Sequence, residues 1–248
     1  MENIVAIIPA RGGSKRIPGK NVKLFCGKPI MAYSIEAALQ SGLFARVIVS
    51  TDSKDIADVA LQYGAEVPCM RPPELADDHA GTDEVILHML EWLELHDKLP
   101  KWACCIYATA PFVTPGSLRR GFDILCHSGA STAISVTHFE FPIYRALRQR
   151  VDGKVEMIWP ENLHRRSQDL PEAFHDAGQF YWLDVGRYCV SQSLFNDNTA
   201  PVLLSRHEVQ DIDTPEDWLV AERMYAVMKQ QDVDRVTEPV MVPQKEIS

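Results

Sequence analysis

Short apolar runs alternate with segments of helical periodicity through residue 137, and this alternation constrains the fold more than any other feature. Continuously apolar runs of this length are typical of strands buried on both faces, and the segments between them have helix start and stop signals. Repeated β-α-β order indicates a mostly parallel sheet covered by helices. We therefore expect an α/β fold. The predicted strands are Ile4–Ile8, Arg46–Ser50, Ala65–Cys69, Trp102–Tyr107 and Ala130–Thr137, and the predicted helices are 30–39, 53–63, 83–95 and 114–128.

The pattern changes after residue 138. Asp152-Gly153 is a hairpin turn signal between two short strand-like runs, and residues 139–175 are predicted to form an insertion on the main sheet. Further strands are predicted at Phe180–Leu183 and Val209–Ile212, followed by a helix that begins at Thr214-Pro215 and ends near Lys229. We expect one domain over 1–230 and a disordered tail over 231–248.

Bulk composition excludes several classes of protein. The formal net charge is -9, which disfavours binding to nucleic acid or to an anionic membrane surface. No apolar run reaches the roughly 18 residues of a membrane span, and the N-terminus has no signal-peptide pattern. The six cysteines show no metal-binding spacing. The expectation is a soluble protein of the reducing cytoplasm, with small buried thiols at Cys104 and Cys105.

A cationic, glycine-containing loop follows the first strand. Residues Pro9–Asn21 contain three glycines and four cationic side chains, Arg11, Lys15, Arg16 and Lys20. Glycine lets backbone N–H groups turn toward a ligand, so this loop predicts a cradle for a di- or triphosphate. It matches neither the Walker pattern nor the dinucleotide fingerprint, which leaves Asp52 a weak candidate for a dehydrogenase ribose ligand. The remaining alternative is a flexible, solvated loop.

Two aspartates near the end of the chain suggest a metal site. Asp211 and Asp213 are two residues apart on a predicted strand, so their carboxylates should point to the same side. Like charges held together are costly unless a cation lies between them, and oxygen ligands suit Mg²⁺ or Mn²⁺. The alternative is that Asp213 belongs to a helix-capping turn with Thr214.

The residues Ile4–Asn21, IVAIIPARGGSKRIPGKN, resemble the opening signature of the CMP-sugar synthetases for nine-carbon acidic sugars and, less closely, that of the Kdo cytidylyltransferases. Further similar segments are Gly27–Ile30, Ser50–Asp52, Arg71–Ala76 and Asp211–Asp217. Segments 165–173 and 175–182 resemble the pseudaminic acid cytidylyltransferase branch. The similarity extends to about residue 230. Tyr107 stands where relatives often have Gln, which also favours this branch.

This resemblance implies a Rossmann-like three-layer nucleotide-diphospho-sugar transferase fold that joins CTP and a nonulosonic acid, giving the CMP-sugar and pyrophosphate. It implies catalytic roles for Arg11, Lys20 and Asp211, and a metal site, Mg²⁺ or Mn²⁺, on Asp211 and Asp213. The implied nucleotide-binding residues are Ala10, Arg11, Gly12, Gly13, Ser14, Lys15, Lys20, Asn21, Arg71, Ala80 and Thr82.

The resemblance also implies a sugar site and a homodimer. Gln179, Phe180 and Tyr181 are the candidate sugar contacts, with Phe180 equally suited to the core, and Arg165 is a candidate for the sugar carboxylate. In relatives the insertion forms a dimer and reaches the neighbouring subunit's site. The apolar residues of its hairpin, Val155, Met157, Ile158 and Trp159, fit such a contact.

Three alternatives remain open at this stage. The sugar could be neuraminic, legionaminic or Kdo acid in place of pseudaminic acid. The chain could be a non-catalytic nucleotide-binding regulatory protein, which the pair of aspartates argues against. An NAD-dependent enzyme is the third alternative, and the missing fingerprint argues against it.

Overall fold

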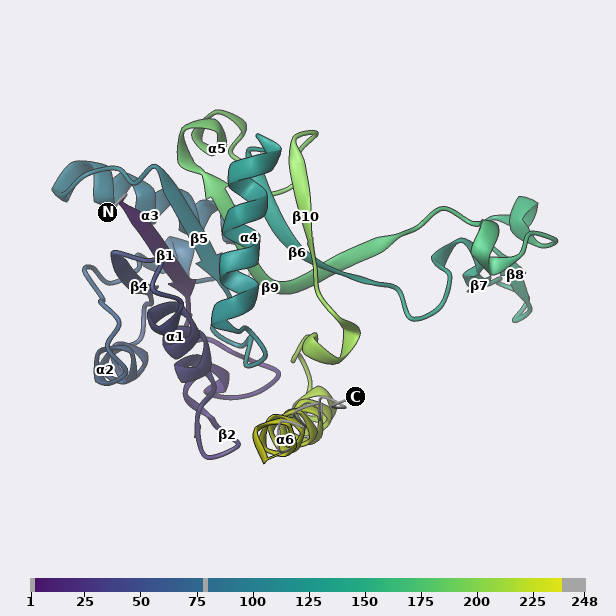
Figure 1. Ribbon diagram of the computed structural model, residues 1–248, viewed down its shortest axis with the longest axis horizontal. Helices are drawn as coiled ribbons and strands as arrows, with labels where there is room; N and C mark the ends of the chain where they lie inside the picture. Colours follow the sequence, from purple (N-terminus) through teal and green to yellow (C-terminus); the bar gives the residue numbers. More distant parts are fainter. Residues whose placement is uncertain (1–2, 78–79, 238–248) are drawn as a thin grey trace, which may run out of the picture.

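The computed structural model describes residues 3–77 and 80–237, which form a six-stranded mixed sheet in the order β10-β6-β9-β5-β1-β4 (Figure 1). The strand β1 is parallel to both of its neighbours, and β10 is parallel to β6. Only β9 is antiparallel to the strands beside it. The strands are β1 Ile4–Pro9, β4 Arg46–Ser50, β5 Trp102–Ile106, β6 Thr132–His138, β9 Phe174–Asp184 and β10 Thr199–Leu203.

Helices cover both faces of this sheet, which gives the predicted three layers. Alternate residues of β1 enter two different cores: Ile4, Ala6 and Ile8 pack with α1, α2 and α4, whereas Val5 and Ile7 pack with α3 and α5. This explains why the strand is continuously apolar. The helices are α1 Ile30–Ser41, α2 Lys54–Gln62, α3 Thr82–His96, α4 Pro115–Ser128, α5 Val185–Ser191 and α6 Pro215–Thr237.

A third, smaller core joins the first helix of the chain to the last. Phe25, on the short strand β2 (Leu24–Phe25, paired with β3, Lys28–Pro29), contacts Trp218 and Tyr225 of α6 edge to face, with ring centroids 5.5 and 5.6 Å apart. Ile17 and Ile212 are buried in the same cluster. Because Ile17 lies within the cationic loop and Ile212 lies between Asp211 and Asp213, the cluster brings those segments together.

Several predicted element boundaries are wrong. The segment 65–69 makes only isolated bridges to the sheet through Glu66 and Met70, and 209–212 is an irregular connection and not a strand. The strand β10 was not predicted, and β9 begins six residues before the expected strand. The helix α6 continues to Thr237, past the predicted end near Lys229; disorder of the tail stays a prediction, and 238–248 lie outside the described residues.

Residues 139–173, which we call the arm, project from the sheet between β6 and β9 (Figure 1). The predicted hairpin is present as the antiparallel pair β7, Leu147–Gln149, and β8, Val155–Met157. The arm also contains the short 3₁₀ turns Ile143–Arg145, Pro160–Asn162 and Ser167–Asp169. Outside the arm, 3₁₀ turns are found at Lys20–Val22, Pro73–Leu75 and Arg206–Glu208.

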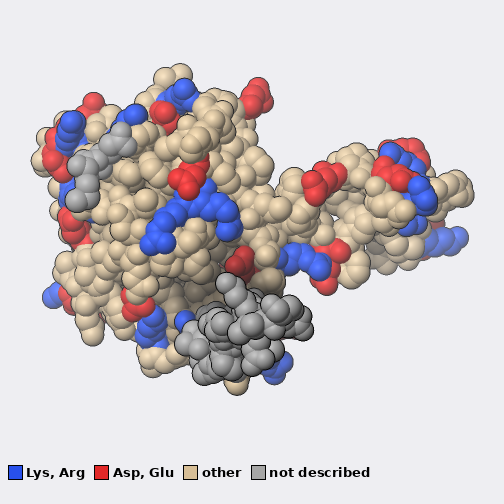
Figure 2. Space-filling view, viewed as in Figure 1, with Lys and Arg blue, Asp and Glu red and all other residues tan. Residues whose placement is uncertain are grey.

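Within residues 3–77 and 80–237, no helix is both long and apolar enough to cross a lipid bilayer. Basic and acidic side chains are interspersed over the body and the arm on the face drawn in Figure 2.

The close packing of α4 on β9 yields a stability prediction. A Cβ atom at Gly121 would lie 2.7 Å from Trp182 Cδ1 and 2.8 Å from Phe180 Cε2, both in fully buried rings. Gly121→Ala should therefore lower the free energy of unfolding by about 1–3 kcal/mol, which exceeds the gain of up to about 1 kcal/mol in helix propensity.

Urea unfolding measures this change, and Gly116→Ala is the matched control. Gly116 lies in the first turn of the same helix, where a Cβ would be 3.7 Å from the closest atom, Thr114 Oγ1. Equal midpoints for the two variants would show that α4 and β9 do not pack as described.

Candidate active site

The cationic loop, residues 10–21, leaves the carboxyl end of β1 and is fixed at its base by the neighbouring strand. The backbone N–H of Gly12 donates to Asp52 Oδ1 at 2.8 Å, directly after β4. A Cβ at Gly12 would lie 3.0 Å from Ser53 Cβ, so a larger residue would have to displace Ser53 by a few tenths of an ångström. At the far end, Asn21 Nδ2 donates to the Arg11 carbonyl at 2.9 Å. The loop is therefore held in one shape and is not a freely solvated segment.

The loop contacts Asp213 and the backbone of Ile212. Lys20 Nζ donates to the Ile212 carbonyl at 2.6 Å and lies 3.4 Å from Asp213 Oδ1, while Arg16 Nη2 lies 2.9 Å from Asp213 Oδ2. The Lys20 side chain is only 18% exposed, so its charge is partly withdrawn from water. The first and last functional segments of the chain thus meet at one point.

The environment of Asp211 disfavours its negative charge. The residue is exposed by surface area, yet the pKa of its carboxyl is raised, first by desolvation and second by the charge of Asp213. Lys20 opposes this shift. We predicted that a strand would point both carboxylates to the same side, and this is wrong because 209–212 is not a strand. The turn that begins α6 brings the two carboxylates together. In this turn, Asp217 Oδ2 accepts hydrogen bonds from the N–H groups of Asp213 and Thr214.

Two carboxylates suit a hard divalent cation. Among the described residues, no group of three or more His, Cys, Asp or Glu side chains is placed to hold a metal. A cation here would therefore complete its shell with water and substrate oxygens, which is how Mg²⁺ is usually bound beside phosphates. The donor set fits Mg²⁺ or Mn²⁺ better than a metal that prefers nitrogen or sulfur ligands.

A cavity of about 460 Å³ opens between the loop, the start of α3 and the end of β5. Most of the predicted nucleotide-binding residues line it: Arg11, Ser14, Lys15, Lys20, Asn21, Arg71, Ala80 and Thr82. Ala10, Gly12 and Gly13 belong to the loop but are not part of the lining. The other lining residues include Arg16, Tyr107 and Asp213. The cationic side chains and one carboxylate therefore face a shared space.

Arg71 provides a buried positive charge at this cavity. The residue is 6% exposed, and its guanidinium donates to the Ser50 hydroxyl and carbonyl and to the Leu75 carbonyl. Burial lowers the pKa of Arg71, Asp52 opposes the shift and Arg11 adds to it. Its hydrogen bonds all end on uncharged oxygens, so an electron-rich ligand group in the cavity would be favourable.

The predicted sugar contacts are mostly enclosed. Phe180 is 0% exposed and packs in the core under α4, which favours the alternative that its ring belongs to the core. Tyr181 is 1% exposed on the opposite face, and its hydroxyl donates to Asp176 Oδ2 at 2.7 Å. Gln179 is 2% exposed and donates through Nε2 to the Glu208 carbonyl. None of the three lines the nucleotide cavity.

Arg165 lies in the arm, which projects from the sheet (Figure 1), and it does not line the nucleotide cavity. Its Nη2 donates to the Asp169 carbonyl at 2.6 Å. In one copy of the chain, Arg165 is therefore not part of the site.

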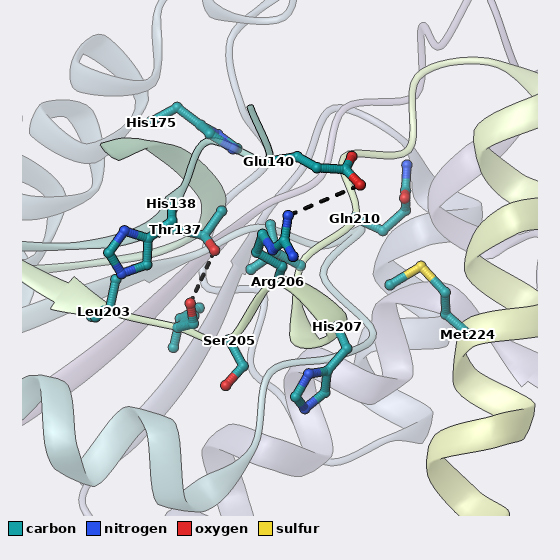
Figure 3. Close-up of a pocket in the computed structure, with 12 residues that line it drawn as sticks. Thr137, His138, Glu140, His175, Leu203, Ser205, Arg206, His207, Gln210 and Met224 are labelled. Atoms are coloured by element: carbon teal, nitrogen blue, oxygen red, sulfur yellow. Dashed lines mark hydrogen bonds and ion pairs between the residues drawn. The ribbon is translucent and has the colours of Figure 1, made fainter. Parts of the chain in front are cut away.

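A second, larger cavity of about 930 Å³ lies between the ends of β6 and β10 and the helix α6 (Figure 3). Its wall includes a 4.0 Å ion pair between Arg206 and Glu140 and the hydrogen bond from Thr137 Oγ1 to the Leu204 carbonyl. Gln210, which precedes Asp211, also lines it. The connection from β10 to α6 thus separates the two cavities.

Sequence reasoning missed two residues that shape the site. Asp52 fixes the loop through Gly12, and its position directly after β4 was the available signal, because β4 neighbours β1 in the sheet. Arg16 contacts Asp213, but no local pattern distinguishes it from the other cations of the loop.

Comparison with known families identifies the class of protein. The cationic loop lies at the carboxyl edge of the sheet, which is where open α/β sheets bind their ligands. The family model described as cytidylyltransferase matches residues 5–181. The chain therefore belongs to the cytidylyltransferase family, whose members are nucleotidyltransferases.

Curated relatives of known activity cover nearly the whole chain. Pseudaminic acid cytidylyltransferase of Campylobacter jejuni is 39% identical over 92% of this chain and 97% of its own length. CMP-N,N'-diacetyllegionaminic acid synthase of Legionella pneumophila is 36% identical over 89% of this chain and 95% of its own. N-acylneuraminate cytidylyltransferase of Escherichia coli is 28% identical, over 93% of this chain and 54% of its own.

Solved structures share the fold at low identity. CMP:2-keto-3-deoxy-manno-octonic acid synthetase, solved with CTP, superposes with a TM-score of 0.65 at 17% identity and covers 93% of this chain and 100% of that one. The 4-diphosphocytidyl-2C-methyl-D-erythritol synthase of Anaerococcus prevotii has a TM-score of 0.59 at 13% identity, covering 91% of this chain and 99% of that one. These similarities confirm the predicted fold class.

The contact between Gly12 and Asp52 generates a binding prediction. Asp52→Ala removes the acceptor that fixes the loop and should raise the dissociation constant for CTP about tenfold, since a hydrogen bond to a charged group contributes about 1.5–3 kcal/mol. Asp52→Asn keeps an oxygen that can accept from Gly12 and should stay within about threefold of wild type.

Isothermal titration with CTP measures both constants. The pair separates geometry from charge, because both variants remove the same negative charge. Equal weakening in both would mean that Asp52 acts by charge and does not position the loop.

Proposed function

We propose that this chain joins CTP and pseudaminic acid to give CMP-pseudaminic acid and pyrophosphate. The observation that carries the proposal is the contact of Arg16 and Lys20 with Asp213 at the edge of a cavity lined by the cationic loop. The choice of sugar rests on the 39% identity to the Campylobacter jejuni pseudaminic acid enzyme over nearly the full length of both chains.

The residues suit catalysis by positioning and charge neutralisation. Arg11, Ser14, Lys15 and the loop backbone would hold the triphosphate, while Lys20 would stabilise charge that builds on the α-phosphate and the departing pyrophosphate. Arg71, with the backbone of Ala80 to Thr82, would contact the cytosine ring, whose acceptor and donor pattern differs from that of uracil. The sugar hydroxyl would attack the α-phosphorus in line with the leaving group.

Mg²⁺ is the proposed cofactor, with Mn²⁺ as a substitute, and Asp211 and Asp213 would hold it. The ion would supply a Lewis acid for phosphate oxygens. Asp213 is already neutralised by Arg16 and Lys20, so we expect Asp211 to be the stronger ligand and Lys20 to reorient toward phosphate when the nucleotide binds.

A homodimer built through the arm is proposed on the basis of exposed apolar surface. Phe141, Leu147, Val151 and Val155 are 76%, 59%, 109% and 65% exposed, which is costly unless another surface covers them. A second copy would also bring its Arg165 toward a cavity that the arm of the first copy does not reach. The cytoplasmic location expected from composition stays a prediction.

Turnover with a panel of sugars tests the proposed function. Pyrophosphate release with CTP and Mg²⁺ should be fastest with pseudaminic acid when neuraminic, legionaminic and Kdo acids are compared at equal concentration. Lys20→Ala should bind CTP but turn over at least about 100-fold more slowly, because one group aimed at developing charge contributes about 3 kcal/mol.

Two results would contradict this proposal in different ways. Equal or faster turnover with another acid would reject the sugar assignment while keeping the reaction. Tight CTP binding without pyrophosphate release from any acid would favour the non-catalytic nucleotide-binding alternative.

The dimer proposal predicts the effect of a charge in the arm. Val155→Asp would place a carboxylate in an apolar contact and should convert the dimer to a monomer, as measured by light scattering after gel filtration. Val190→Asp, at an 87% exposed position on α5, is the control and should stay dimeric. A monomeric wild type would contradict the proposed dimer, and a dimeric Val155→Asp would place the interface elsewhere.

A further inference from the structure

The side chain of Gln179 links the central sheet to the connection that carries the two aspartates. Gln179 lies in β9, is 2% exposed and donates through Nε2 to the Glu208 carbonyl. Glu208 is three residues before Asp211 in the chain. The amide oxygen of Gln179 is buried and has no hydrogen-bond partner among residues 3–77 and 80–237.

The connection from β10 to α6, residues 204–214, has few other attachments to the sheet. At its start, the Leu204 N–H donates to the Val136 carbonyl at 2.8 Å. At its end, Lys20 donates to the Ile212 carbonyl, and the Ile212 side chain is 1% exposed. The 3₁₀ turn Arg206–Glu208 lies between these two attachments, and its backbone hydrogen bonds are made within the turn. The side chain of Gln179 supplies the hydrogen bond that joins β9 to the middle of the connection.

The backbone of Gln179 reaches the nucleotide cavity from the other side. Its carbonyl accepts from the Tyr107 N–H at 2.8 Å. Tyr107 lines that cavity, and its hydroxyl is 2.9 Å from the Thr82 hydroxyl. One residue therefore connects the cavity wall at the end of β5 with the segment that precedes Asp211 and Asp213.

We propose that Gln179 is a positioning residue that sets the location of Asp211 and Asp213 relative to the nucleotide cavity. This proposal rests on the proposed function and replaces the expectation that Gln179 contacts the sugar. Two observations favour it: the side chain is enclosed, and its donor group is already used by Glu208. A buried amide oxygen without a donor is destabilising, so an apolar side chain of the same size would serve the core better.

Gln179→Met tests the proposal because it keeps the volume and removes the amide. Hydrogen exchange is measured on the wild type and the variant without ligands. In the variant, peptides of residues 204–213 should exchange at least about tenfold faster than in the wild type, because the hydrogen bond from Gln179 to Glu208 is lost. Peptides of the cationic loop should be unchanged. Gln62→Met, at an exposed position in α2, is the control and should match wild type.

Kinetics provide the second readout. With CTP, Mg²⁺ and sugar acid, kcat of Gln179→Met should fall between about 10- and 100-fold, since small displacements of positioned groups carry such costs. The KM for CTP should change less than about twofold, and half-maximal activity should need more Mg²⁺. Gln179→Asn, which is too short to reach Glu208, should give the same pattern if the Met variant does not fold.

The outcomes separate this inference from the proposed function. Wild-type exchange in 204–213 and wild-type kcat for Gln179→Met would overturn the positioning role. A raised KM for the sugar at unchanged exchange would also overturn it in favour of direct sugar contact. Failure of the wild-type protein to turn over any acid would reject the proposed function, while the exchange result would still decide whether Gln179 holds the segment.

Discussion

The site depends on one set of contacts between residues far apart in the sequence. Asp213 is held by Arg16 and by Lys20, which is 193 positions away, and the Ile212 carbonyl accepts from the same lysine. The ion pair between Lys20 and Asp213 is partly buried, so dissolved salt screens it less than it screens an ion pair on the surface. The small core around Phe25 and Trp218 supports this contact by docking the start of α6 beside the loop. Without that core, the Asp213 carboxylate and the cations would not face a common cavity.

The sheet determines where this contact can form. Because β1 is buried on both faces and paired on both edges, its carboxyl end can deliver the loop only to the crevice at the edge of the sheet. Asp52, which follows the neighbouring strand β4, fixes the loop, and Arg71 adds a buried positive charge. A site with this much positive charge persists in a protein of net charge -9 because the loop concentrates its cations locally.

The sequence was sufficient to predict the strands β1, β4, β5 and β6 and the loop that follows β1, because periodicity and glycine placement are local signals. It failed where tertiary context decides. The segment 209–212 was predicted to be a strand, but Ile212 fills the small core and its backbone carbonyl accepts a hydrogen bond from Lys20. Phe180 and Tyr181 resemble sugar contacts, but β9 lies between two strands and its rings fill both cores. The role of Asp52 depends on strand order, which periodicity does not encode.

The most direct test of this account is a crystal structure of the protein with CTP and Mn²⁺, in which anomalous scattering locates the ion. The account predicts the triphosphate against the backbone of residues 12–15 and the Lys20 ammonium, with the ion between the α-phosphate and the carboxylates of Asp211 and Asp213. An ion bound away from both aspartates, or a triphosphate outside the loop, would contradict it.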